Sequence, residues 1–530
     1  MQRLLFLRRW EPADMYDQTT ADLIRRIPTV RGFDSERMPE LLTACYAQIS
    51  SSRLLLAEGE SDTDLDEALQ DLKALAQALQ VYAALTIDPR MRESAAFVSA
   101  SAHQLLFKAD RLKGEDNSGR VQLNASSVPA EIACALLFLA AGYPADSAEA
   151  ASAIQGFSTE GDPRNEVLRA LIALCRGNLR AVGGGQIGVN PELPTEEQAE
   201  LCLWGKLLRA IQLLARRMSE PGPAAAATYE EFVVQCEEVV SMSIAELELP
   251  NELQMPQAVY AGYAAPHHIA TLLLGAGNGL NERALTDVAD PVGPDSDPWR
   301  SFLDQRLNER PYMWTNHMEA VADGLLDRGV SAAISFPTGA GKSTLSELKI
   351  IATVLSGSKV IYLAPTLALV GQVSRSLRNL LSEAEVDEDE VEDQLFNMPD
   401  AVLEKMVSVM TPERCLLQLT LQPEAFEDIG LIVFDECHSL HLAKESHQQR
   451  PISAMIGLLS MLELAPDADI LMMSAMMANG DSIAEWLSSS FGKNCLVFNA
   501  AWKPTRQARG SLVFRQEEIA AARALVCPHS

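Results

Sequence analysis

Six short apolar runs alternate with helical stretches after residue 300, and this pattern constrains the fold more than any other feature of the sequence. The runs are Ala332–Phe336, Val360–Ala364, Met406–Met410, Leu431–Phe434, Ile470–Met473 and Leu496–Phe498. Continuously apolar strands separated by helices form a parallel sheet that is covered on both faces. The sequence therefore predicts an α/β domain over residues 301–515 with a mostly parallel sheet. Ligands of such sheets bind at the carboxyl ends of the strands.

The first part of the chain, residues 1–286, is predicted to form an all-α domain. Apolar residues recur every three or four positions, as on one face of a helix, at Leu69, Leu72, Leu75, Leu79 and Tyr82. A second helix is predicted from Thr195, where Thr195 and Gln198 have capping-box spacing, to a stop before Pro221. Similar patterns cover residues 131–142, 163–177 and 228–248. Two roles remain open for this domain: a packing scaffold, or a surface that binds a protein partner.

Between these two parts, Asp287–Pro298 contains three prolines and Gly293, which break regular structure. We therefore expect a linker over residues 287–300. Residues 516–530 are expected to be a C-terminal tail.

Composition limits the class of protein. The chain carries 43 basic and 72 acidic residues, a net charge of −29, so it lacks the basic excess of proteins that bind nucleic acid mainly through charge. No apolar run approaches the roughly 20 residues of a membrane span. The nine cysteines form no Cys-x-x-Cys pair, which indicates reduced thiols. We expect a soluble cytoplasmic protein.

The strongest chemical motif is Pro337–Thr344, which follows the first apolar run and opens a predicted helix. Glycines in such a turn let backbone N–H groups point at phosphate oxygens, and the helix dipole favours negative charge. In this P-loop, Lys342 is expected to reach the β- and γ-phosphates of ATP, and the Ser343 hydroxyl to ligate Mg²⁺. The predicted nucleotide-binding residues are Thr338, Gly339, Ala340, Gly341, Lys342, Ser343 and Thr344.

A second motif ends the apolar run Leu431–Phe434, where Asp435 and Glu436 follow directly. Both carboxylates should lie beside the P-loop, with Asp435 suited to Mg²⁺ and Glu436 to the attacking water. An alternative is a metal site made of Cys437, His438, His441 and His447. Their spacing does not match the two ligand pairs of a zinc site, and the carboxylate pair already accounts for the cluster.

These residues resemble the motifs of superfamily 2 helicases. Asp435–His438 resembles the DExH box of that family, which is related to the DEAD/DEAH box. Other segments are similar to motif Ia (Leu363–Val370), motif Ib (Thr411–Arg414) and motif III (Ser474–Met476). Further segments are similar to the Ski2-like branch, at Asp481–Leu487 and Trp502–Thr505. The resemblance covers residues 310–515 and implies the first RecA-like domain of a P-loop NTPase.

The resemblance implies ATP-driven movement along, or unwinding of, DNA or RNA. It assigns strand phosphates to Thr366, Thr411 and Arg414, through hydroxyls and helix N-termini that need little net positive charge. It also implies that His438 and Ser474 couple the nucleotide state to the grip on the strand. A long helical region before a Ski2-like core also resembles bacterial DNA-repair and phage-defence helicases, including the Hachiman type, so DNA repair or antiviral defence is the expected setting.

The chain departs from the family pattern at several positions. Met476 ends motif III where the family has Thr, and His317 occupies the place of the adenine-reading glutamine. Glu383–Asp393 holds eight carboxylates, a composition typical of a solvated loop, although it could also repel a strand or bind a basic partner. The arginine-rich motif of a second RecA-like domain does not occur. We therefore expect the ATP-binding half of a motor, with weak hydrolysis on its own.

Two other classes of function remain. One is a nucleotide-gated interaction protein that binds ATP without translocation. The other is a helical scaffold with an inactive ATPase, against which the presence of Lys342, Asp435 and Glu436 argues. Nucleic-acid-stimulated turnover would separate the motor from the gated protein.

Overall fold

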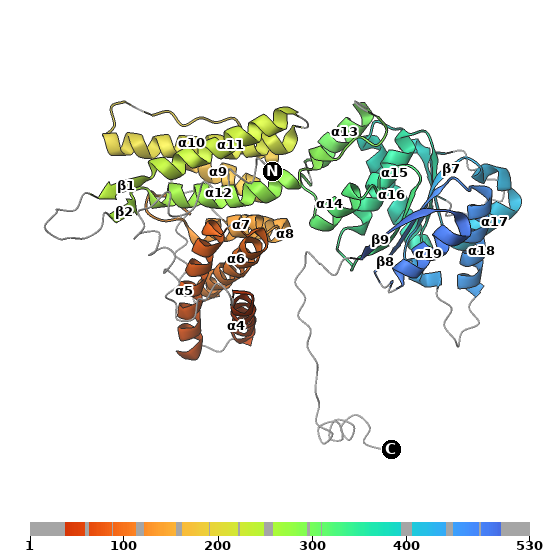
Figure 1. Ribbon diagram of the computed structural model, residues 1–530, viewed down its shortest axis with the longest axis horizontal. Helices are drawn as coiled ribbons and strands as arrows, with labels where there is room; N and C mark the ends of the chain where they lie inside the picture. The colour runs from red at the N-terminus through yellow and green to blue at the C-terminus, as the bar shows by residue number, and fades with distance from the viewer. Residues whose placement is uncertain are drawn as a thin grey trace, which may run out of the picture.

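The computed structural model describes residues 38–58, 63–86, 88–112, 121–154, 162–189, 191–220, 223–247, 258–293, 297–308, 310–393, 405–440, 449–475, 477 and 479–499. They form a helical part and a part built around one large sheet, which lie side by side in Figure 1. The predicted fold class, an all-α domain followed by an α/β domain, is confirmed. No helix among the described residues is long and apolar enough to cross a membrane.

The helical part packs its helices around one apolar core, whose largest fully buried side chains include Phe138, Trp204 and Phe232. Its α-helices are α4 (Met38–Glu58), α5 (Thr63–Leu85), α6 (Pro89–Leu112), α7 (Ala130–Ala140), α8 (Pro144–Ser152), α9 (Arg164–Cys175), α10 (Thr195–Ser219), α11 (Pro223–Met242) and α12 (Ala264–Glu282). Short 3₁₀ turns occur at η2 (Leu179–Val182) and η4 (Leu285–Asp287).

Two local predictions in this part need correction. The capping box at Thr195 does not form: Pro194 is the N-cap of α10, and Gln198 Nε2 donates to the carbonyl oxygens of Pro191 and Leu193. The helix expected over residues 228–248 ends at Met242. Strand β1 (Ile244–Leu247) follows and pairs antiparallel with β2 (Ala258–Ala261), a long-range pairing that overrides the local helical period.

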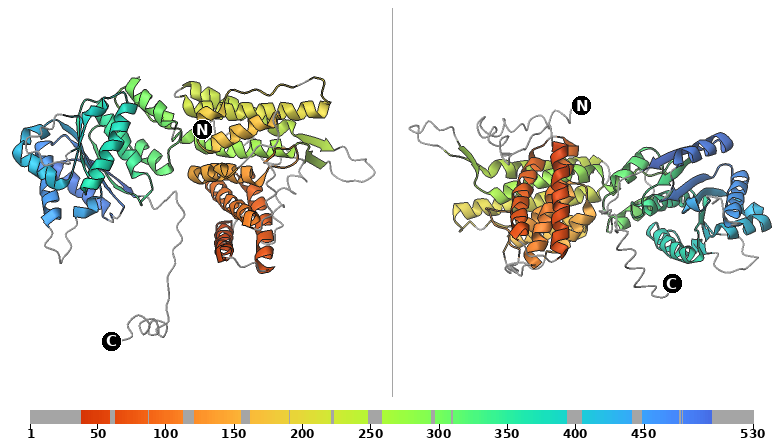
Figure 2. Two further views of the ribbon diagram at one scale, coloured as in Figure 1. Left: turned by 180° about the vertical axis from the view of Figure 1, so that it is seen from behind. Right: turned by 90° about the horizontal axis from the view of Figure 1, so that it is seen from below.

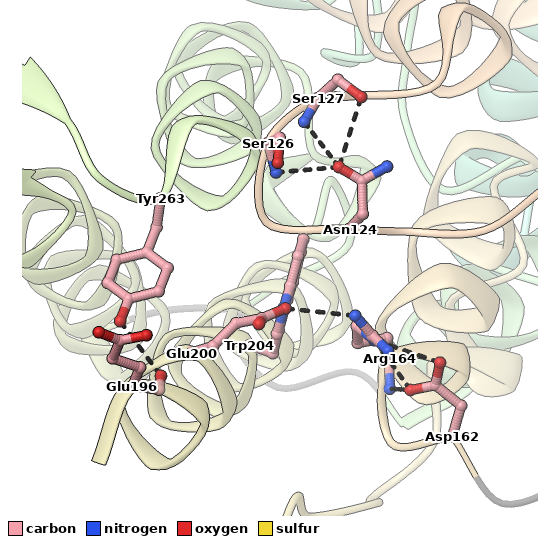
Figure 3. A network of polar contacts seen from close by, with 9 residues as sticks. All are labelled: Asn124, Ser126, Ser127, Asp162, Arg164, Glu196, Glu200, Trp204 and Tyr263. Atoms are coloured by element: carbon pink, nitrogen blue, oxygen red, sulfur yellow. Dashed lines mark hydrogen bonds and ion pairs between the residues drawn. The ribbon is translucent and has the colours of Figure 1, made fainter. Parts of the chain in front are cut away.

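A polar network ties three helices of this part together (Figure 3). Glu200 of α10 accepts hydrogen bonds from Arg164 Nη1 at 3.3 Å and from Trp204 Nε1 at 2.9 Å. The Tyr263 hydroxyl, just before α12, donates to the carbonyl oxygen of Glu196 at 3.1 Å. These bonds satisfy polar groups at the edge of the helical core.

A chain of hydrogen bonds inside the helical part joins α5, α6 and α12. His103 Nε2 donates to Gln80 Oε1 at 2.8 Å, and Gln80 Nε2 donates to His268 Nε2. That last bond requires His268 Nε2 to carry no proton. Burial lowers the pKa of His103 to about 4, and burial together with the neighbouring histidines lowers the pKa of His268 to about 4.

Acidification from pH 7.5 to pH 5 is therefore expected to weaken the helical part. Each folded-state pKa lies below the unfolded value of 6.5, so the stabilisation is complete above pH 6.5 and is lost as the pH falls toward 4. The loss at pH 5 is about 2 kcal/mol per histidine. Urea unfolding followed by circular dichroism at both pH values measures it. His268→Gln, which keeps an uncharged acceptor, should remove about half of this loss; an unchanged pH dependence would contradict the assignment.

The α/β part contains one seven-stranded sheet in which every pairing is parallel. The strand order is β5-β6-β4-β7-β8-β3-β9. The strands are β3 (Val330–Ser335), β4 (Lys359–Leu363), β5 (Val391–Asp393), β6 (Val407–Met410), β7 (Ile429–Phe434), β8 (Asp469–Ser474) and β9 (Asn494–Asn499). All six predicted strands are confirmed within one to two residues at each end.

Helices cover both faces of this sheet (Figure 2). One face packs against α13 (Asp297–Arg306), α14 (Thr315–Ala322), α15 (Lys342–Leu355) and α16 (Leu367–Glu383). The other packs against α17 (Pro412–Leu421), α18 (Gln449–Leu464) and α19 (Gly480–Phe491). Short 3₁₀ turns are η5 (Glu388–Glu390), η6 (Pro423–Phe426) and η7 (Cys437–Leu440). Alternate residues of the central strands β4, β7 and β8 enter the two apolar cores, as expected for a sheet covered on both faces.

The acidic run was expected to be a solvated loop, but its last residues form the edge strand β5. Val391 is only 3% exposed and pairs with Val407 of β6, while Glu383 belongs to α16 and forms an ion pair with Arg306 at 2.9 Å. A short, charged strand at the edge of a sheet resists pairing with other chains.

Helix α13 begins at Asp297, inside the stretch that was expected to be a linker. Its Trp299 and Phe302 are buried in the same core as Leu285, whereas Ala284 belongs to the core of the helical part.

Candidate nucleotide-binding site

The predicted site residues follow five neighbouring strands at one edge of the sheet. In strand order, Thr411 follows β6, Thr366 lies just after β4, Asp435 follows β7, Ser474 ends β8, and the P-loop follows β3. Because the strands are parallel, their carboxyl ends meet at this edge. The fold therefore brings residues more than a hundred positions apart to one place.

The P-loop adopts a backbone that only glycine accepts easily at two positions. Gly339 and Gly341 have φ of 80° and 84°, in the left-handed region. Gly341 is the N-cap of α15, so Lys342 is the first residue of the helix. Lys342 therefore lies at the positive end of the α15 dipole, and a bound anion such as phosphate stabilises both positive charges. The exposed Ser343 hydroxyl lies in the same first turn.

Lys342 faces the carboxylate pair that follows β7. Its Nζ lies 3.6 Å from Glu436 Oε1. Asp435 Oδ2 accepts a hydrogen bond from the Tyr362 hydroxyl at 3.2 Å, and Asp435 Oδ1 accepts one from the Glu436 amide at 2.9 Å. Glu436 has φ of 49°, an uncommon conformation for a non-glycine residue that occurs often at functional sites.

Burial raises the pKa of Asp435, and the negative charge of Glu436 raises it further. The same surroundings raise the pKa of the Tyr362 hydroxyl well above its ordinary value, so it remains a donor. A carboxylate that lies beside a second negative charge favours a nearby cation. The donor set, a serine hydroxyl and an aspartate, consists of the hard oxygen ligands that Mg²⁺ prefers. Ser343 and Asp435 therefore fit a magnesium ion bound with the phosphates.

His438 joins two of the predicted motifs. Its Nδ1 lies 3.1 Å from Glu436 Oε2 and 3.0 Å from Ser474 Oγ. The two residues assigned to coupling are therefore in contact, and both are linked to the carboxylate expected to position water.

The alternative metal site gains no support from the described residues, where no group of three His, Cys, Asp or Glu side chains could hold a metal ion. Burial raises the pKa of Cys437 to about 12, which keeps its thiol protonated. His441 and His447 lie outside the described residues, as do Met476 and Trp502–Thr505.

The three residues assigned to strand phosphates differ in exposure. Thr366 and Thr411 are the N-caps of α16 and α17 and accept hydrogen bonds from Leu369 N at 3.3 Å and Arg414 N at 3.4 Å. Thr366 is exposed, whereas the Arg414 side chain is buried, at 8% exposure. The contact of these three residues with strand phosphates stays a prediction.

Sequence reasoning missed three residues that contact the predicted site. Asn316 Nδ2 donates to the Ala340 carbonyl at 2.8 Å, Arg310 Nη1 donates to Thr344 Oγ1 at 3.0 Å, and Tyr362 donates to Asp435. Tyr362 occupies an apolar run, and the other two lie 24 and 34 residues before the P-loop residues that they contact, so no local pattern marks them.

Comparison with known proteins agrees with this geometry. Residues 315–483 match the family model described as DEAD/DEAH box helicase. Over 219 residues the chain is 25% identical to the ATP-dependent DNA helicase Hel308 of Methanocella arvoryzae, covering 39% of this chain and 28% of the relative. Over 189 residues it is 26% identical to the DExH-box ATP-dependent RNA helicase DExH10 of Arabidopsis thaliana, covering 35% of this chain and 17% of the relative.

A solved structure, the DUF1998 helicase MrfA bound to DNA and AMPPNP, matches 39% of this chain and 29% of its own chain. The identity is 18% and the TM-score 0.31. Among the curated relatives, the matched part of the chain spans less than a third of the length of the first two Hel308 proteins. Together, the family match, the relatives and the ordered motifs show that residues 315–483 form a DEAD/DEAH box helicase domain.

Proposed function

We propose that this chain supplies the ATP-binding half of a nucleic-acid helicase or translocase of the DExH type. The observation that supports this most directly is the meeting of Lys342, Glu436, His438 and Ser474 at the carboxyl edge of the sheet. A phosphate-binding cation and a carboxylate pair are parts that phosphoryl transfer to water requires. The contact of His438 with Ser474 links them to β8.

Each residue has a distinct task in this proposal. The P-loop amides and Lys342 hold the β- and γ-phosphates, while Ser343 and Asp435 hold Mg²⁺, which neutralises charge that develops on the phosphate oxygens. Glu436 orients the attacking water and accepts its proton. His438, in contact with both Glu436 and Ser474, transmits the state of the nucleotide to β8.

The strand-binding side of the proposal rests on helix N-termini. Thr366 and Thr411 begin α16 and α17, and the N-terminus of a helix favours phosphate. This mode suits a chain with a net charge of −29. The names of the relatives include a DNA helicase and an RNA helicase, so the strand is DNA or RNA. DNA repair or antiviral defence is the proposed setting.

Replacing Lys342 with alanine tests the ATP site. We expect the dissociation constant for Mg-ATP to rise by about ten- to hundred-fold, because a charged partner of the phosphates is lost. Isothermal titration calorimetry measures it, and a phosphate-release assay should show that the slow hydrolysis of the wild-type chain disappears. Lys206→Ala, which removes a lysine paired with Glu238 in the helical part, is the matched control and should bind ATP as the wild type does. Unchanged affinity in Lys342→Ala would rule out the P-loop assignment.

A further inference from the structure

The segment that leads into the P-loop region is hydrogen-bonded to the end of the helical part. Leu285 N donates to the Pro311 carbonyl at 3.2 Å, and Met313 N donates to the Arg283 carbonyl at 2.8 Å. Between them, Ala284 and Tyr312 form an antiparallel bridge. Residues 283–285 and 311–313 are thus a short ladder that joins the two parts, which lie side by side in Figure 1.

On the helical side, this ladder is firmly held. Tyr312 packs against the helical core, and the ring of Pro311 lies against Gly177, after α9. The side chain of Arg283 forms an ion pair with Glu93 of α6, with Nη2 3.0 Å from Oε1. The position of residues 311–313 therefore follows the helical part.

On the nucleotide side, the next residues rest directly on the P-loop. Asn316 Nδ2 donates to the Ala340 carbonyl at 2.8 Å. The imidazole of His317 occupies the space that a side chain at Gly341 would need, and it stacks on Trp314 with ring centroids 5.2 Å apart. Burial lowers the pKa of His317 to about 4, so the ring is neutral near pH 7. His317 is thus turned toward the P-loop backbone.

A cavity of about 1110 Å³ lies beside the ladder, between the two parts. Glu93 and Arg283 line it from the helical side, and Asn316 lines it from the α/β side. The cavity therefore borders the Glu93–Arg283 ion pair, the Arg283 end of the ladder and Asn316, which contacts the P-loop. It separates the two parts of the chain at this place.

We propose that Asn316 and His317 are positioning residues that hold the P-loop in its ATP-binding conformation, and that the helical part sets their placement through the ladder and the Glu93–Arg283 ion pair. The affinity for ATP then depends on how the helical part is positioned relative to the α/β part. This inference rests on the proposed function, because it concerns the same nucleotide site.

Two single variants and the double variant test whether the helical part acts on the P-loop through the ladder. Asn316→Ala removes the bond to Ala340, and Glu93→Gln removes a charge in the helical part, on the other side of the ladder. Each is expected to raise the dissociation constant for Mg-ATP by about three- to ten-fold while leaving kcat at saturating ATP nearly unchanged. Because both act through one route, the double variant should bind ATP no more weakly than the weaker single variant.

Glu200→Gln is the matched control, since it removes a carboxylate charge from an ion pair within the helical part (Figure 3). It should leave ATP affinity unchanged, and thermal unfolding followed by circular dichroism should show that all variants fold. The inference is overturned if Glu93→Gln binds ATP as the wild type does, if Glu200→Gln weakens binding equally, or if the two single effects multiply in the double variant. A wild-type chain that binds no ATP would instead overturn the proposed function itself.

Discussion

Replacing Glu436 with glutamine is expected to leave Mg-ATP binding intact and to slow hydrolysis by about 10²- to 10⁴-fold. Glutamine keeps the shape of the side chain and the Asp435 carboxylate beside it, but it cannot accept the proton of the attacking water. The change also removes the charge that faces Lys342 at 3.6 Å and His438 at 3.1 Å. Titration calorimetry and a single-turnover phosphate-release assay separate the two effects.

A matched control is available for this substitution. Glu385 is the other described glutamate with a positive φ, at 57°, and it is exposed just after α16. Glu385→Gln therefore makes the same chemical change in a similar backbone conformation, and it should leave the rate unaltered. If Glu436→Gln hydrolysed ATP at the wild-type rate, another group would have to position the water.

The central sheet could be predicted because each strand carries its own signal. A buried parallel strand is a continuous apolar run, and six such runs were visible without any knowledge of their partners. Strand β5 gave no such signal, since Val391 stands alone among acidic residues and pairs with Val407 only once the sheet is assembled. The pairing of β1 with β2 depends in the same way on partner residues 11 to 17 positions further along the chain.

The residues of the candidate site likewise divide into those that a local sequence pattern marks and those that only the folded structure places. Lys342, Asp435 and Glu436 could be identified because glycines, an apolar run and a helix fix their chemistry locally. The burial of Arg414 could not be foreseen, since it depends on how α17 packs in the folded domain. The contact of Asn316 with Ala340 likewise depends on how α14 docks against the P-loop.

A second RecA-like domain, fused after Ser530 or supplied as a separate subunit, is expected to raise ATP turnover by about 10³- to 10⁵-fold. The carboxylate end of the site is open to solvent, where the side chains of Glu436 and His438 are 33% and 44% exposed. The resemblance to superfamily 2 motors implies that a second domain closes over this side and brings an arginine finger. That guanidinium would stabilise the charge that develops on the transferred phosphate, a contribution that Lys342 alone does not make.

Phosphate release measured with and without single-stranded DNA or RNA tests this expectation, together with unwinding of a labelled duplex. The 530-residue chain alone should bind ATP, hydrolyse it slowly and respond little to either strand. Addition of the second domain should make turnover strand-dependent, and replacement of its finger arginine by alanine should remove most of the gain. Turnover that stays strand-independent in the completed protein would favour a nucleotide-gated interaction protein. Strong unwinding by the 530-residue chain alone would contradict this expectation and would favour the helical part as the other wall of the ATP site.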